Sequence, residues 1–301
     1  MRASGGRPVG HAVPAIPDSL RENLAYGLGS EQAERWLADA VERAEELFEA
    51  WDLEPEQVLS GGSESLCVKC TGADGDSVLK LPASVPGGAA EIAALHAWQG
   101  DGAARVLREQ PEQSVMLMNF LGWVGQGSYT LPEVLDLADR LHRADPAPYL
   151  FPALDANLAR RVAWARDRFA EVSDDEALAD VDAAEKILAA LVDTLADGDP
   201  VLLHGDLQPK NLIVSDAGLA VVDPLPAVGP AMYDVALYVV KCPRDHALTS
   251  CQDEVLALRP ELDADRLRQW CWALAVLESR PYLGDLNARR VEYIRKFRDE
   301  V

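Results

Sequence analysis

The sequence of 301 residues lacks the features of several large protein classes. No segment approaches the roughly 20 consecutive apolar residues that a membrane-spanning helix needs, so we expect no membrane partner. The opening residues 1–7 lack the apolar run of a secretory signal peptide, which leads us to expect a cytoplasmic protein. Only five cysteines are present, and an odd number without a secretory signal argues against a disulfide framework.

Positive charge is also scarce. The chain has 28 Lys and Arg residues against 50 Asp and Glu residues, which gives a formal net charge of −22. A non-specific nucleic-acid binder needs a basic surface, so we expect no nucleic-acid partner. An acidic cleft instead concentrates cations and would speed the capture of a small cationic substrate. Surface acid also serves solubility alone, and charge by itself leaves both interpretations open.

The N-terminal part of the chain predicts a small lobe behind a tail. Residues 1–18 are rich in Gly and Pro and are expected to form a disordered tail. Apolar residues recur at helical spacing between 19 and 50. The short apolar runs 66–71 and 77–81, separated by a turn rich in Gly and Asp, predict a β-hairpin. With two further strand-like runs and one inserted helix, residues 19–118 are predicted to form a small antiparallel sheet with leading helices.

From Leu131 onward helical patterns dominate. The exception is 201–223, where short apolar runs are joined by polar loops. Strands that precede the helices, rather than alternate with them, indicate an α+β fold in two lobes. Residues 119–301 are therefore predicted to form the larger, mostly helical C-lobe, which includes the most informative motif of the sequence.

That motif is the segment His204–Asn211, together with the acidic end of a later apolar run, Asp223. Phosphoryl transfer needs a carboxylate that orients the attacking hydroxyl and accepts its proton, and oxygen ligands for the Mg²⁺ that bridges the phosphates. Asp206, Asn211 five residues later and Asp223 twelve residues after that supply this set. Gly, Asp, Pro and Asn also favour plain turns, but the flanking apolar runs and the spacing favour a phosphoryl-transfer site.

A phosphoryl-transfer site also needs a lysine on an upstream strand to hold the nucleotide phosphates. Lys80 interrupts the apolar run 77–81, which is costly unless its ammonium meets an acid or a phosphate. Glu91, in the next predicted helix, is the expected partner, and an edge-strand lysine facing solvent is the alternative. The loop 59–65, which includes Ser63, is expected to cover the phosphates because its glycines let backbone amides approach an anion. The expected cofactors are therefore ATP (or GTP) and Mg²⁺.

Taken together, these motifs resemble the aminoglycoside phosphotransferase group of the protein-kinase-like fold. More narrowly, they resemble the streptomycin 6-phosphotransferase and hydroxyurea phosphotransferase family, over about residues 20–240. The resemblance implies a bilobal fold with a small antiparallel-sheet N-lobe that binds the nucleotide and a larger helical C-lobe that holds the acceptor. The segments that carry it are 29–37, Val78–Leu81, Ala94–Leu107, His204–Asn211 and Asp223–Pro224, with Gly229 and Asp234 beyond.

The resemblance also implies roles for the chemical residues. Asp206 would be the catalytic base. Asn211 and Asp223 would be the magnesium ligands, and Lys80 would contact the phosphates with Glu91 as its partner.

Further residues would support this site. His204 would bond around the catalytic loop, and Asp234 would be a buried acid that braces the loop through its backbone. Met118 and Phe120 would belong to a hinge whose backbone grips the adenine edge. Lys210 stands where the family often has a small residue, and it either helps to neutralise the transferring phosphoryl group or points to solvent.

The activity implied by the resemblance is that of an ATP-dependent O-phosphotransferase. It would phosphorylate a hydroxyl of a small cationic antibiotic, a streptomycin-like aminoglycoside, and so confer resistance. Acidic residues of the C-lobe are expected to meet the cationic acceptor, with Asp155, Glu278 and Asp285 as candidates. A kinase for a tuberactinomycin-type cyclic peptide antibiotic and a metabolic kinase for a sugar or amino alcohol are the alternatives. The sequence leaves a monomer and a dimer equally open.

Overall fold

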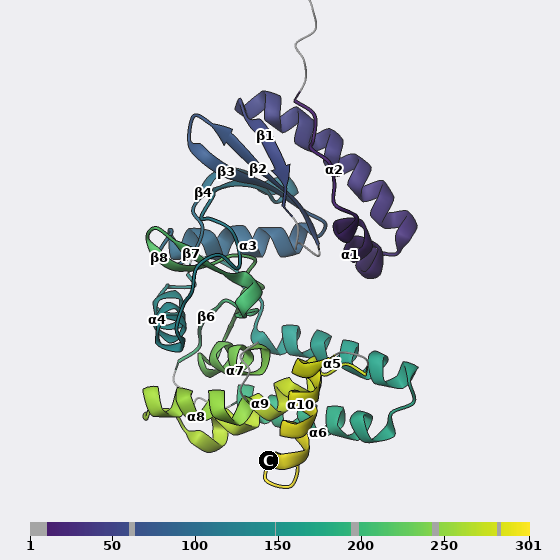
Figure 1. The fold of residues 1–301 in the computed structure, drawn as a ribbon, viewed down its shortest axis with the longest axis vertical. Helices are drawn as coiled ribbons and strands as arrows, with labels where there is room; N and C mark the ends of the chain where they lie inside the picture. The colour runs from purple at the N-terminus through teal and green to yellow at the C-terminus, as the bar shows by residue number, and fades with distance from the viewer. Residues whose placement is uncertain (1–10, 60–63, 148, 194–198, 243–246, 282–283) are drawn as a thin grey trace, which may run out of the picture. The chain divides into compact units, whose positions relative to one another are not determined.

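The computed structural model describes residues 11–59, 64–147, 149–193, 199–242, 247–281 and 284–301 (Figure 1). The chain divides into two compact units. Unit 1 comprises Met1–Gly100 and Ala104–Leu121, and unit 2 comprises Asp101–Ala103 and Gly122–Val301. Within the described ranges, no helix has the length and apolar character needed to cross a membrane.

Unit 1 is built on a five-stranded antiparallel sheet with the strand order β1-β2-β3-β5-β4. The predicted hairpin is confirmed, since β2 and β3 pair from Ser65 opposite Pro82 to Gly72 opposite Gly75. Gly75 closes the turn with a φ of +83°, a left-handed conformation that glycine adopts without steric cost. The strands are β1 Glu54–Val58, β2 Ser65–Gly72, β3 Gly75–Pro82, β4 Val106–Gln110 and β5 Val115–Asn119.

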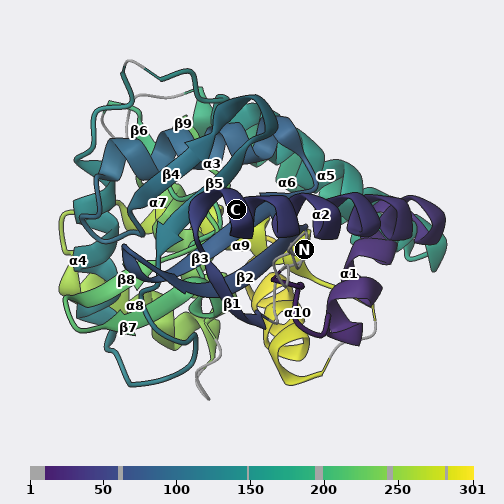
Figure 2. The same cartoon turned by 90° about the horizontal axis from the view of Figure 1, so that it is seen from above.

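Two helices, α1 (Asp18–Leu28) and α2 (Ser30–Trp51), pack against each other, and α2 also packs on the sheet at β3 (Figure 2). The buried residues of α2 recur at helical spacing, so that one side of the helix is apolar and the other is polar. That apolar side shares a core with residues of the strands. The core cluster includes Leu20, Leu24, Leu37, Ala44, Leu47, Phe48, Leu66, Val68, Leu79, Leu81 and Leu117.

The prediction of a disordered tail over residues 1–18 does not hold for the part that the structure describes. Val13 and Ile16 pack against the core cluster, and the Val13 N–H donates to Glu45 Oε1 at 3.3 Å. Asp18 is already the first residue of α1. Residues 11–18 thus contact unit 1 through apolar and polar side chains, whereas residues 1–10 lie outside the described ranges.

A third helix, α3 (Val85–Trp98), packs on the sheet at β3. Successive side chains of a strand point to opposite faces. Since Leu79 and Leu81 belong to the core cluster beneath α1 and α2, Lys80 between them points to the opposite face. There it meets a side chain of α3, Glu91.

Unit 2 is mostly helical. Its central helix α9 buries residues on all sides, including Trp270 and Trp272, and packs against α5, α6, α7, α8 and α10. A helix that is apolar around most of its surface belongs in the middle of a bundle. The helices are α4 Leu131–His142, α5 Leu154–Glu171, α6 Asp175–Val192, α7 Met232–Lys241, α8 Leu248–Leu258, α9 Ala264–Glu278 and α10 Asp285–Phe297.

The exceptional segment 201–223 forms short strands, as predicted. β6 (Val201–Leu203) pairs with β9 (Ala227–Gly229), and β7 (Leu212–Ser215) pairs with β8 (Gly218–Val221). Residues 204–211, called the Asp206 loop below, connect β6 to β7 and end in the short 3-10 helix Pro209–Asn211. The loop is therefore anchored at both ends by hydrogen-bonded strands.

Candidate active site

The Asp206 loop begins with a sharp bend at Gly205. This glycine has a φ of +75°, and a Cβ atom built on it would lie 1.9 Å from the carbonyl oxygen of Leu225. The adjacent carbonyl of His204 accepts the Leu225 N–H at 2.8 Å. Only glycine fits between these two backbone segments, and the close approach fixes the direction in which the chain enters Asp206.

Asp234 holds the same bend from the other side. It lies in the first turn of α7 and is fully buried. Its Oδ2 accepts the backbone N–H of His204 at 2.8 Å, and its Oδ1 accepts that of Gly205 at 2.9 Å. Nε2 of His142, on α4, lies 3.0 Å from Oδ2. The carboxylate thus ties two helices to the backbone just before Asp206.

His204 connects the loop to the segment that follows β8. Its ring is buried, with Nε2 3.1 Å from the Val222 carbonyl and Nδ1 accepting the Asp206 N–H at 3.2 Å. Because Nδ1 is an acceptor, the proton of the neutral ring sits on Nε2. Burial lowers the pKa of His204 below its ordinary value, despite the opposing effect of Asp234 and Asp206. His204 is therefore a neutral connector.

One oxygen of Asp206 is held by its own loop. Oδ2 accepts from Gln208 Nε2 at 2.6 Å and from Asn211 Nδ2 at 3.1 Å. The same Asn211 nitrogen donates to the Asp206 carbonyl at 2.9 Å, which turns the Asn211 amide oxygen away from Asp206. Lys210 Nζ lies 3.7 Å from Oδ2, although its side chain is 58% exposed. The Lys210 side chain is thus mostly exposed to solvent, and its role towards the transferring phosphoryl group stays a prediction.

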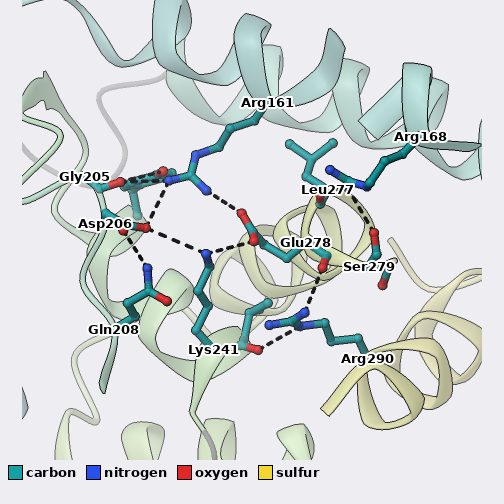
Figure 3. A network of polar contacts seen from close by, with 12 residues as sticks. Arg161, Arg168, Gly205, Asp206, Gln208, Lys241, Leu277, Glu278, Ser279 and Arg290 are labelled. Carbon is teal, nitrogen blue, oxygen red and sulfur yellow. Dashed lines mark hydrogen bonds and ion pairs between the residues drawn. The ribbon is translucent and has the colours of Figure 1, made fainter. Parts of the chain in front are cut away.

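The other oxygen, Oδ1, faces two cations from distant helices (Figure 3). Arg161 Nη2 lies 3.5 Å from Oδ1 and 3.1 Å from the Gly205 carbonyl, and Lys241 Nζ lies 3.7 Å from Oδ1. Glu278 joins both cations, since Arg161 Nη1 donates to its Oε1 and Lys241 Nζ lies 2.9 Å from its Oε2. Asp206, Arg161, Glu278 and Lys241 thus form a closed charge ring.

The charge ring keeps both carboxylates ionised. Burial acts to raise the pKa of Asp206, but Lys241, Arg161 and Lys210 outweigh it and bring the pKa below its ordinary value. The pKa of Glu278 is likewise lowered, because Lys241 and Arg161 overcome the effect of burial. Both side chains are therefore carboxylates at neutral pH.

Asn211 and Asp223 have the chemistry of a magnesium site. The Val222 N–H donates to the Asn211 carbonyl at 3.0 Å, which brings the residue before Asp223 against Asn211. Asp223 has a φ of +55°, a costly conformation for a residue with a side chain. Carboxylate and amide oxygens are ligands that Mg²⁺ accepts together with phosphate oxygens and water. The two residues therefore fit the metal.

In unit 1, Lys80 and Glu91 form a buried ion pair. Lys80 Nζ lies 2.6 Å from Glu91 Oε1, and the two residues are 3% and 6% exposed. Lys80 is centred in the sheet, opposite Cys67 of β2 and Met116 of β5. The alternative of a solvent-facing edge lysine is therefore excluded.

Comparison with known proteins decides which family this site belongs to. Residues 50–282 match the family described as aminoglycoside/hydroxyurea antibiotic resistance kinase. The chain belongs to this family. It is 30% identical over 234 residues to a streptomycin 6-kinase of Streptomyces griseus, which covers 73% of each chain. It is 29% identical over 267 residues to a streptomycin 6-kinase of Streptomyces glaucescens, covering 84% of this chain and 80% of the relative.

A solved structure places the kinase in the same fold as other antibiotic phosphotransferases. A thermostable mutant of aminoglycoside phosphotransferase APH(4)-Ia, in a ternary complex with ADP and hygromycin B, is similar with a TM-score of 0.58. The likeness covers 83% of this chain and 96% of that chain, at 18% sequence identity. The predicted bilobal protein-kinase-like fold is confirmed, and the chain is a phosphotransferase of the antibiotic-inactivating kind that acts on a hydroxyl group.

The acceptor residues predicted for this kinase lie in different surroundings. Glu278 is next to Asp206, but its two oxygens are paired with Arg161 and Lys241, contrary to the expectation of a carboxylate that waits for a substrate cation. Asp155 and Asp285 are exposed in the first turns of α5 and α10. Of the three predicted residues, only Asp155 and Asp285 have a carboxylate that is exposed to a substrate cation.

Part of the predicted hinge backbone is already hydrogen-bonded within unit 1. Met118 is buried in β5, opposite Val78 and Val106. The Phe120 N–H donates to the Asp76 carbonyl at 3.0 Å. That N–H is therefore engaged within unit 1, and the expected grip of Phe120 on adenine stays a prediction. Ser63, the predicted phosphate-loop residue, lies outside the described residues.

The Phe120 ring is also held in place. Lys69 Nζ lies 5.2 Å from its centroid, and the ammonium pairs with Glu56 at 2.5 Å and Asp76 at 3.1 Å. A buried cation above an aromatic face stabilises the ring. No role for Lys69 was predicted from the sequence, although a lysine in the apolar strand β2 is the same signal that identified Lys80.

Proposed function

We propose that this kinase transfers the γ-phosphate of ATP to a hydroxyl group of streptomycin or of a closely related cationic aminoglycoside. The observation that carries the proposal is the constrained Asp206 loop in a chain that resembles two streptomycin 6-kinases over most of its length. The ADP-bound relative supports an adenine nucleotide as the donor.

Asp206 orients the acceptor hydroxyl and takes its proton. Phosphoryl transfer passes through a loose transition state, so positioning contributes more than strong basicity. A carboxylate whose pKa lies below its ordinary value suits this task, because it stays ionised and ready to accept a hydrogen bond. The bonds from Gln208 and Asn211 to Oδ2 leave Oδ1 as the oxygen that receives the hydroxyl.

Asn211 and Asp223 would hold Mg²⁺, which would supply positive charge to neutralise the phosphates of the nucleotide. Asn211 contributes its amide oxygen, since its nitrogen is bonded to Asp206. Lys80 contacts the α- and β-phosphates, and Glu91 keeps its ammonium in place for them.

The acceptor is a cation, in keeping with the net charge of −22. Around Asp206, however, the three cations Arg161, Lys210 and Lys241 outnumber the two carboxylates. The positive groups of the acceptor therefore bind away from the charge ring. Asp155, six residues before Arg161 and thus about 9 Å along α5, and Asp285 are the remaining acidic candidates.

A coupled nucleotide-turnover assay tests the proposal. Streptomycin, a tuberactinomycin-type peptide, simple sugars and amino alcohols are offered with ATP or with GTP. We expect turnover with ATP and streptomycin, and a loss of about 10³-fold or more in Asp206→Asn, because the base no longer orients the hydroxyl. Turnover with sugars or amino alcohols alone would overturn the antibiotic as acceptor, and turnover that survives Asp206→Asn would overturn the role of Asp206.

A further inference from the structure

The charge ring is asymmetric. Lys241 Nζ lies 2.9 Å from Glu278 but 3.7 Å from Asp206, and Arg161 makes a close hydrogen bond to Glu278 while its distance to Asp206 is 3.5 Å. All four side chains are largely buried, with exposed fractions of 10–15%. Charges attract one another strongly where water is scarce. Glu278 therefore holds two cations that would otherwise settle on Asp206.

The oxygen that these cations approach is the one that the acceptor needs. Oδ2 of Asp206 already accepts from Gln208 and Asn211. A base must accept a hydrogen bond from the reacting hydroxyl at about 2.6–3.2 Å, which leaves Oδ1. Ammonium and guanidinium groups approach an unshared carboxylate to about 2.8 Å. At that distance Arg161 and Lys241 would occupy the lone pairs of Oδ1.

The position of Glu278 is set by the main chain. Arg290 donates to the Glu278 carbonyl at 2.7 Å and to the Val240 carbonyl at 3.2 Å, so one guanidinium joins the end of α9 to the residue before Lys241 (Figure 3). Arg168 donates to the carbonyls of Leu277 and Ser279, on either side of Glu278, at 2.6 and 3.1 Å. Cations at a helix C-terminus satisfy its last carbonyls. Glu278 and Lys241 are thereby held at a fixed spacing.

We infer that Glu278 is a positioning residue for phosphoryl transfer, because it holds Arg161 and Lys241 at 3.5 and 3.7 Å from Oδ1 of Asp206, short of close contact, and so leaves that oxygen able to accept the acceptor hydroxyl. The inference rests on the proposed function, in which Asp206 orients that hydroxyl. It differs from a role in substrate binding, since the Glu278 carboxylate is paired with cations of the chain itself.

Crystal structures of the wild-type protein and of Glu278→Gln test the geometry without any assumption about the substrate. A neutral amide holds the ammonium less strongly than a carboxylate does. In the variant, the distance from Lys241 Nζ to Asp206 Oδ1 should therefore shorten from 3.7 Å to about 2.8 Å. A wild-type structure without the charge ring, or a variant in which this distance does not shorten, would overturn the inference.

Kinetics with ATP and streptomycin test the consequence. Glu278→Gln should lower kcat by about 10-fold or more and change the KM of ATP by less than about 3-fold, because the nucleotide contacts are elsewhere. Glu278→Asp, which keeps the negative charge, should recover part of the loss. The decisive variant is Glu278→Gln combined with Lys241→Met. It removes one cation together with the anion, and its kcat should exceed that of Glu278→Gln by about 5-fold.

Asp180→Asn is the matched control, since Asp180 is another buried carboxylate of unit 2 that is paired with an arginine, Arg298. It should lower thermal stability and leave kcat unchanged. If Glu278→Gln behaves in the same way, the ring is only structural. If Glu278→Gln raises the KM of streptomycin and Lys241→Met restores nothing, Glu278 binds the substrate. Either result overturns the inference.

Failure of the proposed function has a different signature. If the wild-type enzyme does not phosphorylate streptomycin but phosphorylates another acceptor in the turnover screen, the four variants are measured with that acceptor instead. These are Glu278→Gln, Glu278→Asp, the double variant with Lys241→Met, and Asp180→Asn. We expect the same order of kcat values. Turnover that is unaffected by Asp206→Asn overturns the role of Asp206 and the inference with it.

Discussion

His142 Nε2 lies 3.0 Å from Oδ2 of Asp234, the same oxygen that accepts the backbone N–H of His204 at 2.8 Å. The other oxygen of Asp234 accepts the N–H of Gly205. A buried carboxylate is stable only when donors surround it, and this one draws its donors from α4 and from the chain leading into Asp206. The position of Asp206 therefore depends on a residue 28 positions away in the sequence.

Asp234→Asn should weaken the attachment of the Asp206 loop to α4 and α7. The amide keeps one acceptor oxygen but places an NH₂ group against a backbone N–H, which leaves buried donors facing each other. We expect a loss of about 2–4 kcal/mol in the free energy of unfolding and a fall in kcat of about 10-fold or more. Chemical denaturation and steady-state kinetics measure the two effects. His142→Gln retains a hydrogen-bond donor towards Asp234 and should have smaller effects on stability and kcat. Equal effects of the two variants would argue that Asp234 does not hold the Asp206 loop in place.

Gly205→Ala should abolish the active conformation of the Asp206 loop. The added Cβ would overlap the Leu225 carbonyl oxygen at 1.9 Å, so one of the two backbone segments must move. Gly75→Ala is the matched control, because Gly75 has a similar φ of +83° but no atom within 4 Å of an added Cβ. The control should lose only about 1–2 kcal/mol from backbone strain. Thermal unfolding of the two variants with equal losses would contradict the close approach at Gly205.

The parts of the fold that sequence predicted are those encoded locally. The β2–β3 hairpin follows from a Gly- and Asp-rich turn between two apolar runs. The Asp206 loop follows from residue types whose spacing matches a known chemistry. Lys80 was identifiable because a charge in an apolar strand demands a partner, and Glu91 provides it.

The charge ring was not predicted, because tertiary packing alone selects its members. Arg160 and Arg161 are adjacent in α5, and the sequence gives no reason to expect one of them rather than the other at Asp206. Arg160 is exposed beside the Trp164 ring, at 5.3 Å, whereas Arg161 reaches Asp206. Lys241 ends α7, where a cation is expected merely to complement the helix dipole. The helix faces, and hence the ring, become visible only when α5, α7 and α9 are packed together.

The stability of unit 2 should fall in mild acid because of His204. Burial lowers the pKa of this residue in the folded protein, so below its ordinary value of about 6.5 the unfolded chain binds a proton that the folded chain does not. The free energy of unfolding therefore decreases as the pH falls from about 7 to 5.5, with a contribution of up to about 1.4 kcal/mol per pH unit.

The comparison that isolates this effect is with His204→Gln, which has no proton to take up in this range. Denaturation at a series of pH values should give a steeper pH dependence for the wild-type protein than for the variant, whatever the difference in their absolute stabilities. Parallel curves would show that His204 is not the residue responsible.

The pair Lys80–Glu91 has two separable contributions, one to stability and one to nucleotide binding. Lys80→Met leaves the Glu91 carboxylate buried without its partner, and removing one member of a buried pair costs about 3–5 kcal/mol. Glu91→Gln in the same chain removes that unpaired charge, so the double variant should recover most of the stability. It should not recover the KM of ATP, which we expect to rise by about 10- to 100-fold in both variants, because the phosphates have lost a charge-assisted partner.

Thermal unfolding and the ATP dependence of turnover, measured on the wild-type protein and on Lys80→Met with and without Glu91→Gln, distinguish the two contributions. Lys69→Met is the matched control, since Lys69 is a second buried lysine of the same sheet and is paired with Glu56 and Asp76. It should lower stability with a smaller change in the KM of ATP. If the double variant of Lys80 and Glu91 regains both stability and ATP affinity, the pair only stabilises the fold and the phosphate contact belongs to another residue.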